Sequence, residues 1–161
     1  MRELLTTAQK TAIADIVAES VALEFWVDSS TALVEAAEQQ APPATHKPPR
    51  LLKRKIDALK ERAIPLIGSE EKRAELIGIL CKLQQLATER RTAIHGQWQP
   101  KGGYRLADLL SRQPVPLEEV VFGTRGAEHR LPTGRVELLA DEIKASTKAL
   151  IAFFSDFPFL H

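Results

Sequence analysis

The stretch SEEKRAELIGILCKLQQLATERRTAIHG, residues 69–96, decides the fold class of this chain. Ser69 is a favourable N-terminal cap, and Gly96 is a residue type that commonly follows the last turn of a helix. Between them, apolar residues recur every three or four positions, which is the period of one helical face. These residues are Leu76, Leu80, Leu83, Ala87 and Ile94. The pattern predicts one long amphipathic α-helix.

Three other segments carry the same period. A second apolar seam runs from Leu52 to Leu66, and a fourth runs from Val136 to Phe157. Residues 1–41 contain neither Gly nor Pro, and Phe25 and Trp26 within them are expected in the core. The seam expected there consists of Ile13, Ile16, Val17, Val21 and Phe25. Four such helices predict an all-α fold, specifically a four-helix up-and-down bundle.

Two connecting segments interrupt the predicted helices. Consecutive prolines mark residues 41–49 as a stiff, Pro-rich connector, because proline excludes helix and favours extended backbone. The long loop at 96–132 exceeds what a compact bundle requires. It contains two segments that favour strands, 104–106 and 120–122. We therefore expect an insertion with a β-hairpin before the last helix, within a single domain spanning residues 1–161.

Composition excludes several classes of protein. The 161 residues are 44% hydrophobic and 27% charged, which is typical of a globular domain and not of a disordered chain. The net charge is +1, so any contact with nucleic acid must come from a local patch. A single cysteine, Cys81, excludes an intrachain disulfide framework. Without a signal peptide or a long apolar segment, the sequence predicts a cytoplasmic protein with no membrane contact.

One motif has a chemical interpretation. The predicted third helix ends in ERRTAIHGQW, residues 89–98, in which four residues separate Arg90 from His95. This spacing, with Gly96 and Trp98 after the histidine, resembles the motif of the HEPN superfamily of small helical bundles. Many members carry a polar residue such as Asn after the arginine, where this chain has Arg91. The extra cation either assists phosphate binding or marks a non-catalytic relative.

The resemblance implies metal-independent RNA cleavage, of the kind found in defence and toxin–antitoxin systems. HEPN ribonucleases typically form homodimers that bring the arginine and histidine of both subunits to a shared cleft. Arg90 would then hold the scissile phosphate, because a guanidinium grips phosphate with two donors. His95 would act as acid or base, and Arg91 is a weaker substrate-binding candidate. The implied partners are RNA, a second copy, and an antitoxin or other protein.

Structural interpretations of the same residues remain open. Cations near a helix end and a glycine after it are favoured without any function. Arg90, however, occupies a seam position that should face the core, so it needs a partner or a wet cleft. On a regular helix Arg90 and His95 lie about 140° apart, so a shared pocket requires an irregular helix end or a second subunit. The alternative function is a non-catalytic helical interaction module that binds a protein, nucleotide or RNA.

The basic segment 47–62 is a second candidate surface. It is either a solvated helix face or a surface that tracks phosphates beside Arg90 and His95, with Arg50 and Arg54 as weak substrate-binding candidates. The four histidines show no metal-ligand spacing, so we predict neither a metal site nor a cofactor, and His129 is interpreted as a loop residue. The cations of the segment are Lys47, Arg50, Lys53, Arg54, Lys55, Lys60 and Arg62.

Overall fold

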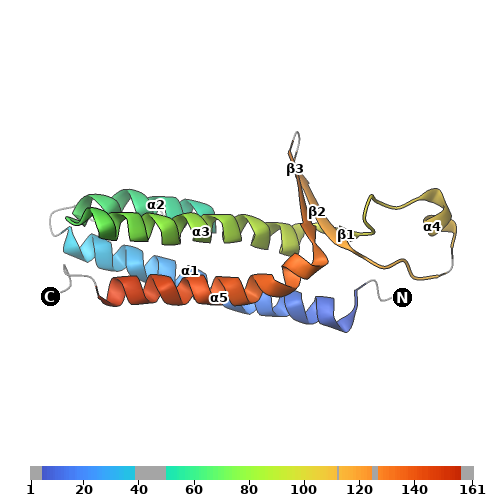
Figure 1. Ribbon diagram of the computed structural model, residues 1–161, viewed down its shortest axis with the longest axis horizontal. Coiled ribbons are helices and arrows are strands. Elements are labelled where there is room, and N and C mark those ends of the chain that lie inside the picture. Colours follow the sequence, from blue (N-terminus) through green and yellow to red (C-terminus); the bar gives the residue numbers. More distant parts are fainter. Residues whose placement is uncertain (1–4, 39–49, 112, 125–126, 157–161) are drawn as a thin grey trace.

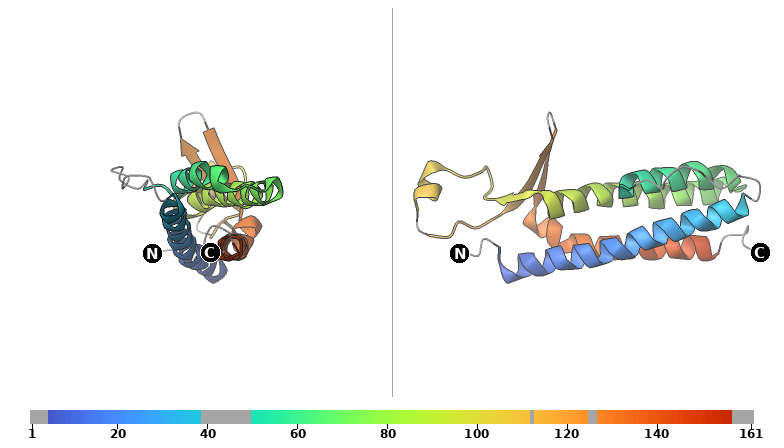
Figure 2. Two further views of the ribbon diagram at one scale, coloured as in Figure 1. Left: turned by 90° about the vertical axis from the view of Figure 1, so that its left-hand side faces the viewer. Right: turned by 180° about the vertical axis from the view of Figure 1, so that it is seen from behind.

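The computed structural model describes residues 5–38, 50–111, 113–124 and 127–156, where the chain is largely helical, as predicted. The predicted Pro-rich connector lies outside these residues. Four long helices pack in two layers, α1 with α5 and α2 with α3 (Figures 1 and 2). Their bounds are α1 (Thr7–Ala37), α2 (Leu52–Leu66), α3 (Glu70–His95) and α5 (Thr133–Ser155).

The predicted up-and-down connectivity is wrong, because α1 and α2 run in the same direction. Two ion pairs show this register: Lys55 pairs with Asp28 at 2.6 Å, and further along both helices Arg62 pairs with Glu35. Only α3 runs opposite to the other long helices (Figure 1). The connection from 38 to 51 is long enough for this, since it can span about 45 Å when extended, whereas α2 is about 22 Å long.

The predicted core seam is largely confirmed in α3 and only partly correct in α1. In α3, Leu76, Leu80 and Leu83 are fully buried. In α1 the expected Ile16 is buried, but Val17, Val21, Phe25 and Trp26, also expected in the core, are exposed. The helix is apolar on more than one side, and the buried side includes two serines, which a search for apolar residues overlooks. The buried residues of α1 are Gln9, Ala12, Ile16, Ser20, Leu23, Val27, Ser30 and Val34.

The insertion between α3 and α5 contains a β-hairpin, as predicted, but only one of its two strands covers a segment that the sequence favoured as a strand. Strands β2 (Glu119–Thr124) and β3 (Ala127–Pro132) pair antiparallel, and β1 (Gln97–Gln99) pairs with β2 on its other edge. The expectation of a strand at 104–106 is wrong, since Leu106 begins the short helix α4 (Leu106–Leu110). Val120 and Leu131 join the helical core, so the sheet packs on one end of the helices (Figure 1).

Gly96 allows the sheet to pack against the end of α3. Its amide donates to the Thr92 carbonyl oxygen at 2.8 Å and ends the helix. A Cβ added at Gly96 would overlap both that oxygen and the Cγ1 of buried Val120. The glycine is therefore required by close approach and not by an unusual backbone angle.

We predict that Gly96→Ala lowers the free energy of unfolding by about 1–3 kcal/mol, as overpacked cores do. Gly78→Ala is the control, because no atom lies within 4 Å of a Cβ added there. In the middle of α3 the added methyl should stabilise the protein by about 0.5–1 kcal/mol. Urea unfolding measures both, and an unchanged midpoint for Gly96→Ala would contradict the packing described.

An ionic cluster ties the last turns of α3 to the start of α5. Arg135 donates from Nε to Glu89 at 2.7 Å and from Nη2 to Glu142 at 3.0 Å. Lys82 pairs with Glu142 at 2.7 Å. Hydrogen bonds from Arg135, then from Lys82, lower the pKa of Glu142 from 4.5 to about 2. The cluster holds the stretch of α3 that carries Arg90 and His95.

A carboxyl group whose pKa is lower in the folded protein than in the unfolded chain stabilises the fold at pH values above the unfolded pKa. This stabilisation is lost as the pH falls through the folded pKa and the carboxylate becomes protonated. We therefore expect the wild-type Tm to fall as the pH is lowered from 4.5 towards 2. Glu142→Gln should lower the Tm at pH 7 and make this acid dependence shallower. Glu137→Gln, at an exposed position of α5, is the control. Equal acid dependence in wild type and Glu142→Gln, measured by thermal melts, would disprove the assignment.

Candidate functional site

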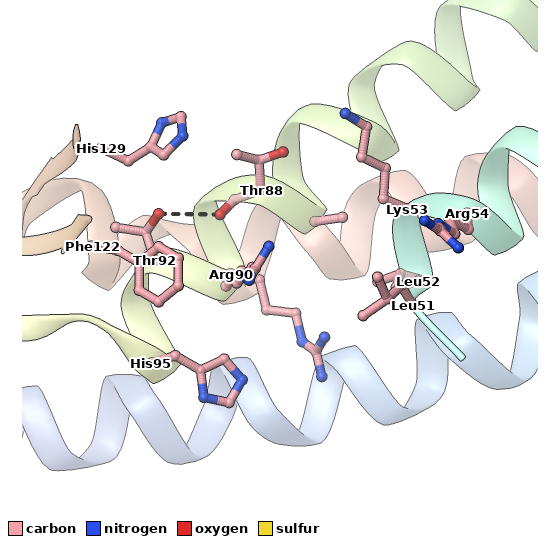
Figure 3. A pocket seen from close by; sticks show the side chains of 12 residues that line it. Leu51, Leu52, Lys53, Arg54, Thr88, Arg90, Thr92, His95, Phe122 and His129 are labelled. Carbon is pink, nitrogen blue, oxygen red and sulfur yellow. Dashed lines mark hydrogen bonds between the residues drawn. The ribbon is translucent and has the colours of Figure 1, made fainter. Parts of the chain in front are cut away.

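A cavity of about 410 Å³ lies where α3 extends beyond α2. Helix α2 has 15 residues and α3 has 26, so the last turns of α3 lack a covering helix on this side. The start of α2 forms one wall of the cavity, and the β2–β3 hairpin forms the other (Figure 3). The lining residues are Leu51, Leu52, Lys53, Arg54, Ala87, Thr88, Arg90, Arg91, Thr92, His95, Phe122 and His129.

Arg90 and His95 both line this cavity and point to the same side, towards α1 (Figure 3). The expectation that they could share a pocket only through an irregular helix end or a second subunit is wrong. Helix α3 continues to His95, and at about 100° per residue its lining residues cover about 200° of its circumference, with Arg90 at one edge. The long arginine stem spans the remaining angle.

Arg90 has fewer partners than a structural arginine at a core position should have. Its Nη2 lies 3.4 Å from Glu24 Oε1, while its Nε is buried and has no hydrogen-bond partner within the described part of the chain. The side chain is 26% exposed. A buried donor without an acceptor costs about 1–3 kcal/mol. The guanidinium therefore has donor capacity that the fold leaves unused.

Arg91 and Phe122 form a second contact within the cavity. The Arg91 guanidinium carbon lies 4.9 Å from the centre of the Phe122 ring, which is a cation–π distance. The hydroxyl of Thr92, another lining residue, is not free to donate to a ligand, because it donates to the Thr88 carbonyl oxygen at 3.2 Å. The Arg91 side chain is thus held against the hairpin, where it faces the cavity.

The basic segment contributes Lys53 and Arg54 to the cavity, and both are exposed. The sequence proposed such a surface only if it adjoined Arg90 and His95, and the structure brings them together. Arg50 is exposed but does not line the cavity. Lys55 and Arg62 pair with acids of α1, which removes them from this surface. Lys47 lies outside the described residues.

His129 is a lining residue that the sequence interpretation placed in an ordinary loop. It lies on β3 directly opposite Phe122 of β2, so the hairpin register brings both to the cavity. Thr92 and Phe122 lie between His129 and His95 in Figure 3. The two imidazoles therefore occupy different parts of the cavity. Only the pairing of β2 with β3, which the sequence did not establish, could have identified His129.

The chemistry of the lining favours an anion. Four lining side chains are cations, two are imidazoles, and none of these twelve described residues carries a carboxylate. The start of α2 adds the positive end of a helix dipole to the same wall. Within the described ranges, His, Cys, Asp and Glu side chains do not gather in threes as a metal site requires.

In comparisons with known proteins, no family model, curated protein or solved structure matches this chain. None of the described helices has the length and apolar character needed to cross a membrane.

Proposed function

We propose that this cavity binds single-stranded RNA and cleaves its backbone without a metal ion, as the resemblance to HEPN ribonucleases implies. One observation carries the proposal: Arg90 and His95 line the same cavity as three further cations, with no carboxylate among the lining residues. A phosphodiester is the anion that this combination suits, because guanidinium groups bind phosphate and an imidazole moves protons at neutral pH.

Cleavage would use the 2′-hydroxyl of RNA as the nucleophile. The 2′-oxygen forms a bond to phosphorus while its proton passes to His95, the general base. The bond from phosphorus to the 5′-oxygen breaks, and that oxygen takes a proton from water. The imidazolium then returns its proton to the remaining hydroxide. Arg90 holds the phosphate and stabilises the charge that develops on its oxygens.

The other lining residues support binding of a strand longer than one nucleotide. Lys53 and Arg54 lie at the α2 wall, while His129 belongs to the hairpin and Arg91 packs on Phe122 of the same hairpin. Cations spread in this way track successive phosphates, and the Phe122 ring with Arg91 offers a surface on which a base stacks. We assign these residues to binding and not to the chemical step.

The wider identity belongs to the same proposal. We infer a HEPN-like protein in which the four long helices form the bundle that presents the motif, with α1 and α2 parallel. A role in a defence or toxin–antitoxin system, with a protein antitoxin as partner in the cytoplasm, is what this family resemblance implies.

The binding half of the proposal predicts a change in salt dependence. Removing one cation that binds a phosphate should reduce the slope of log Kd against log salt by about 0.7 for a single strand. Replacing Lys53 and Arg54 together by alanine should reduce the slope by about 1.4 and weaken RNA binding at least about tenfold at low salt. Fluorescence anisotropy with a labelled RNA measures both quantities.

The matched control removes two exposed lysines of α5, Lys144 and Lys148, which do not line the cavity. The control removes the same net charge as the Lys53 and Arg54 double variant. Because it removes that charge outside the cavity, it should lower RNA affinity only slightly. If the control weakens binding as much as the Lys53 and Arg54 double variant, RNA does not occupy this cavity.

A further inference from the structure

The outer face of α1 is apolar and uncovered. Val17, Val21 and Phe25 follow one another at four-residue spacing and are 42%, 66% and 62% exposed. Exposed Ala14 and Ala18 continue the same face. Since the opposite side of α1 is buried in the core, the helix is apolar on two sides. Helices that are apolar on all sides are normally buried on all sides.

A second exposed apolar surface lies on the insertion between α3 and α5. The arm, defined as residues 100–111, carries α4 beyond the end of the long helices (Figure 1). Leu106, Leu109 and Leu110 are 72%, 67% and 76% exposed. Their spacing places all three on one side of α4, the pattern with which a short helix enters an apolar surface.

The base of the arm is fixed by hydrogen bonds. The Glu119 carboxylate accepts from the Gly102 amide at 3.2 Å and from Arg130 at 2.7 Å. The Gly103 amide donates to the Pro100 carbonyl oxygen at 2.9 Å, and Gly102 has φ +82°, which a glycine adopts without strain. The arm is therefore held in a projecting position, which reduces the entropy lost when it docks.

We propose that the arm of one copy docks on the outer face of α1 of a second copy, and that the two copies exchange arms reciprocally. The inference is independent of the proposed RNA cleavage. Each copy has two exposed apolar surfaces, the arm and the outer face of α1. A dimer with two-fold symmetry therefore covers both surfaces of both copies.

Charge complementarity favours a second copy as the occupant. Four of the five acids of α1 pair with cations of the same chain, while the fifth, Asp15, is exposed close to the outer face. The arm contains Lys101 and Arg105, while its single acid, Asp108, accepts a hydrogen bond from the Arg105 amide. Docking the arm on α1 therefore brings opposite charges together.

The exposed apolar area is large enough for a stable interface only if two arms dock and not one. The three leucines and the Val17, Val21 and Phe25 side chains together expose roughly 650 Å² of apolar surface per docked arm, so two docked arms offer about 1,300 Å², just above the lower limit of about 1,200 Å² for stable interfaces. A single docked arm covers about half that area. Reciprocal exchange should therefore give a dimer that dissociates when either surface is removed.

Sedimentation equilibrium of the full chain across a concentration series tests this. The arm variant is Leu109→Ser with Leu110→Ser, and the α1 variant is Val21→Ser with Phe25→Ser. All four positions are exposed, so circular dichroism should show both variants folded. We expect a wild-type dimer and a dissociation constant raised at least about tenfold in each variant.

An equimolar mixture of the two variants distinguishes arm exchange from other arrangements. The α1 variant keeps an intact arm and the arm variant keeps an intact α1 face, so the mixture should form a weak heterodimer that neither variant forms alone. Dimerisation of the arm variant with wild-type affinity would mean that α1 faces pair directly. That result, or a monomeric wild type throughout the series, overturns the proposal.

Discussion

Replacing His95 by alanine is expected to lower the kcat for RNA cleavage by about 10²–10⁴-fold, the usual contribution of a general acid or base. RNA affinity should change by less than about threefold, because cations supply most of the attraction to a phosphate backbone. His95 lies at the exposed end of α3, outside the core, so the variant should fold normally. Single-turnover cleavage and anisotropy separate the two effects.

His129→Ala is the matched control, since it removes the other imidazole that lines the cavity. Thr92 and Phe122 separate His129 from the side where Arg90 and His95 point (Figure 3). We therefore expect a loss in cleavage of less than about tenfold, seen in KM and not in kcat. If His129→Ala abolishes cleavage while His95→Ala remains active, the assigned base is wrong.

Arg90→Met is expected to lower kcat/KM by about 10²–10³-fold without destabilising the protein, the loss typical of removing one donor to a developing oxyanion. Arg90 leaves its buried Nε unpaired and contacts Glu24 only at 3.4 Å. Glu24 is 35% exposed, so the carboxylate left without its partner stays in contact with water, and an ion pair this exposed contributes at most about 1 kcal/mol. Methionine keeps an apolar stem packed in the same place and removes the unpaired Nε donor. The Tm should therefore stay unchanged or rise.

A purely structural arginine at the end of α3 predicts the opposite combination, a lower Tm and unchanged cleavage. Arg62→Met is the control for loss of an ion-paired arginine, because Arg62 pairs with Glu35 away from the cavity. It should leave cleavage at the wild-type level. Cleavage and thermal melts on the same preparations decide between the two roles of Arg90.

The sequence predicted the fold best where a pattern depends on nearby residues. Leu76, Leu80 and Leu83 repeat at helical spacing, and the structure buries all three. The prediction was only partly right in α1, where Ile16 is buried as expected but Ser20 and Ser30 lie on the buried side and Phe25 lies outside. The Ser20 hydroxyl donates to the carbonyl oxygen of Ile16, so a small polar residue is satisfied within the helix and can face the core.

The direction of α2 could not be predicted from local pattern. The spacing of apolar residues is the same whichever way a helix runs relative to its neighbours. The parallel direction of α1 and α2 becomes evident only from contacts in the folded chain, such as the ion pair between Lys55 and Asp28.

The candidate site was predictable to the extent that its residues share one helix. Arg90, Arg91 and His95 are close in sequence, and the cavity unites them. The sequence made Arg50 and Arg54 equal candidates, yet only Arg54, in the first turn of α2, lines the cavity, whereas Arg50 precedes the helix. His129 depends on strand register, because a shift of one residue would turn its side chain to the other face of the sheet.

The most direct test of the central proposal is incubation of the purified chain with single-stranded RNA in excess EDTA, followed by analysis of the product ends. We predict fragments with 2′,3′-cyclic phosphate and 5′-hydroxyl ends, and no cleavage where the attacking 2′-hydroxyl is replaced by hydrogen. RNA that binds with the predicted dependence on Lys53 and Arg54 but remains intact, with or without a divalent cation, would contradict the proposed chemistry.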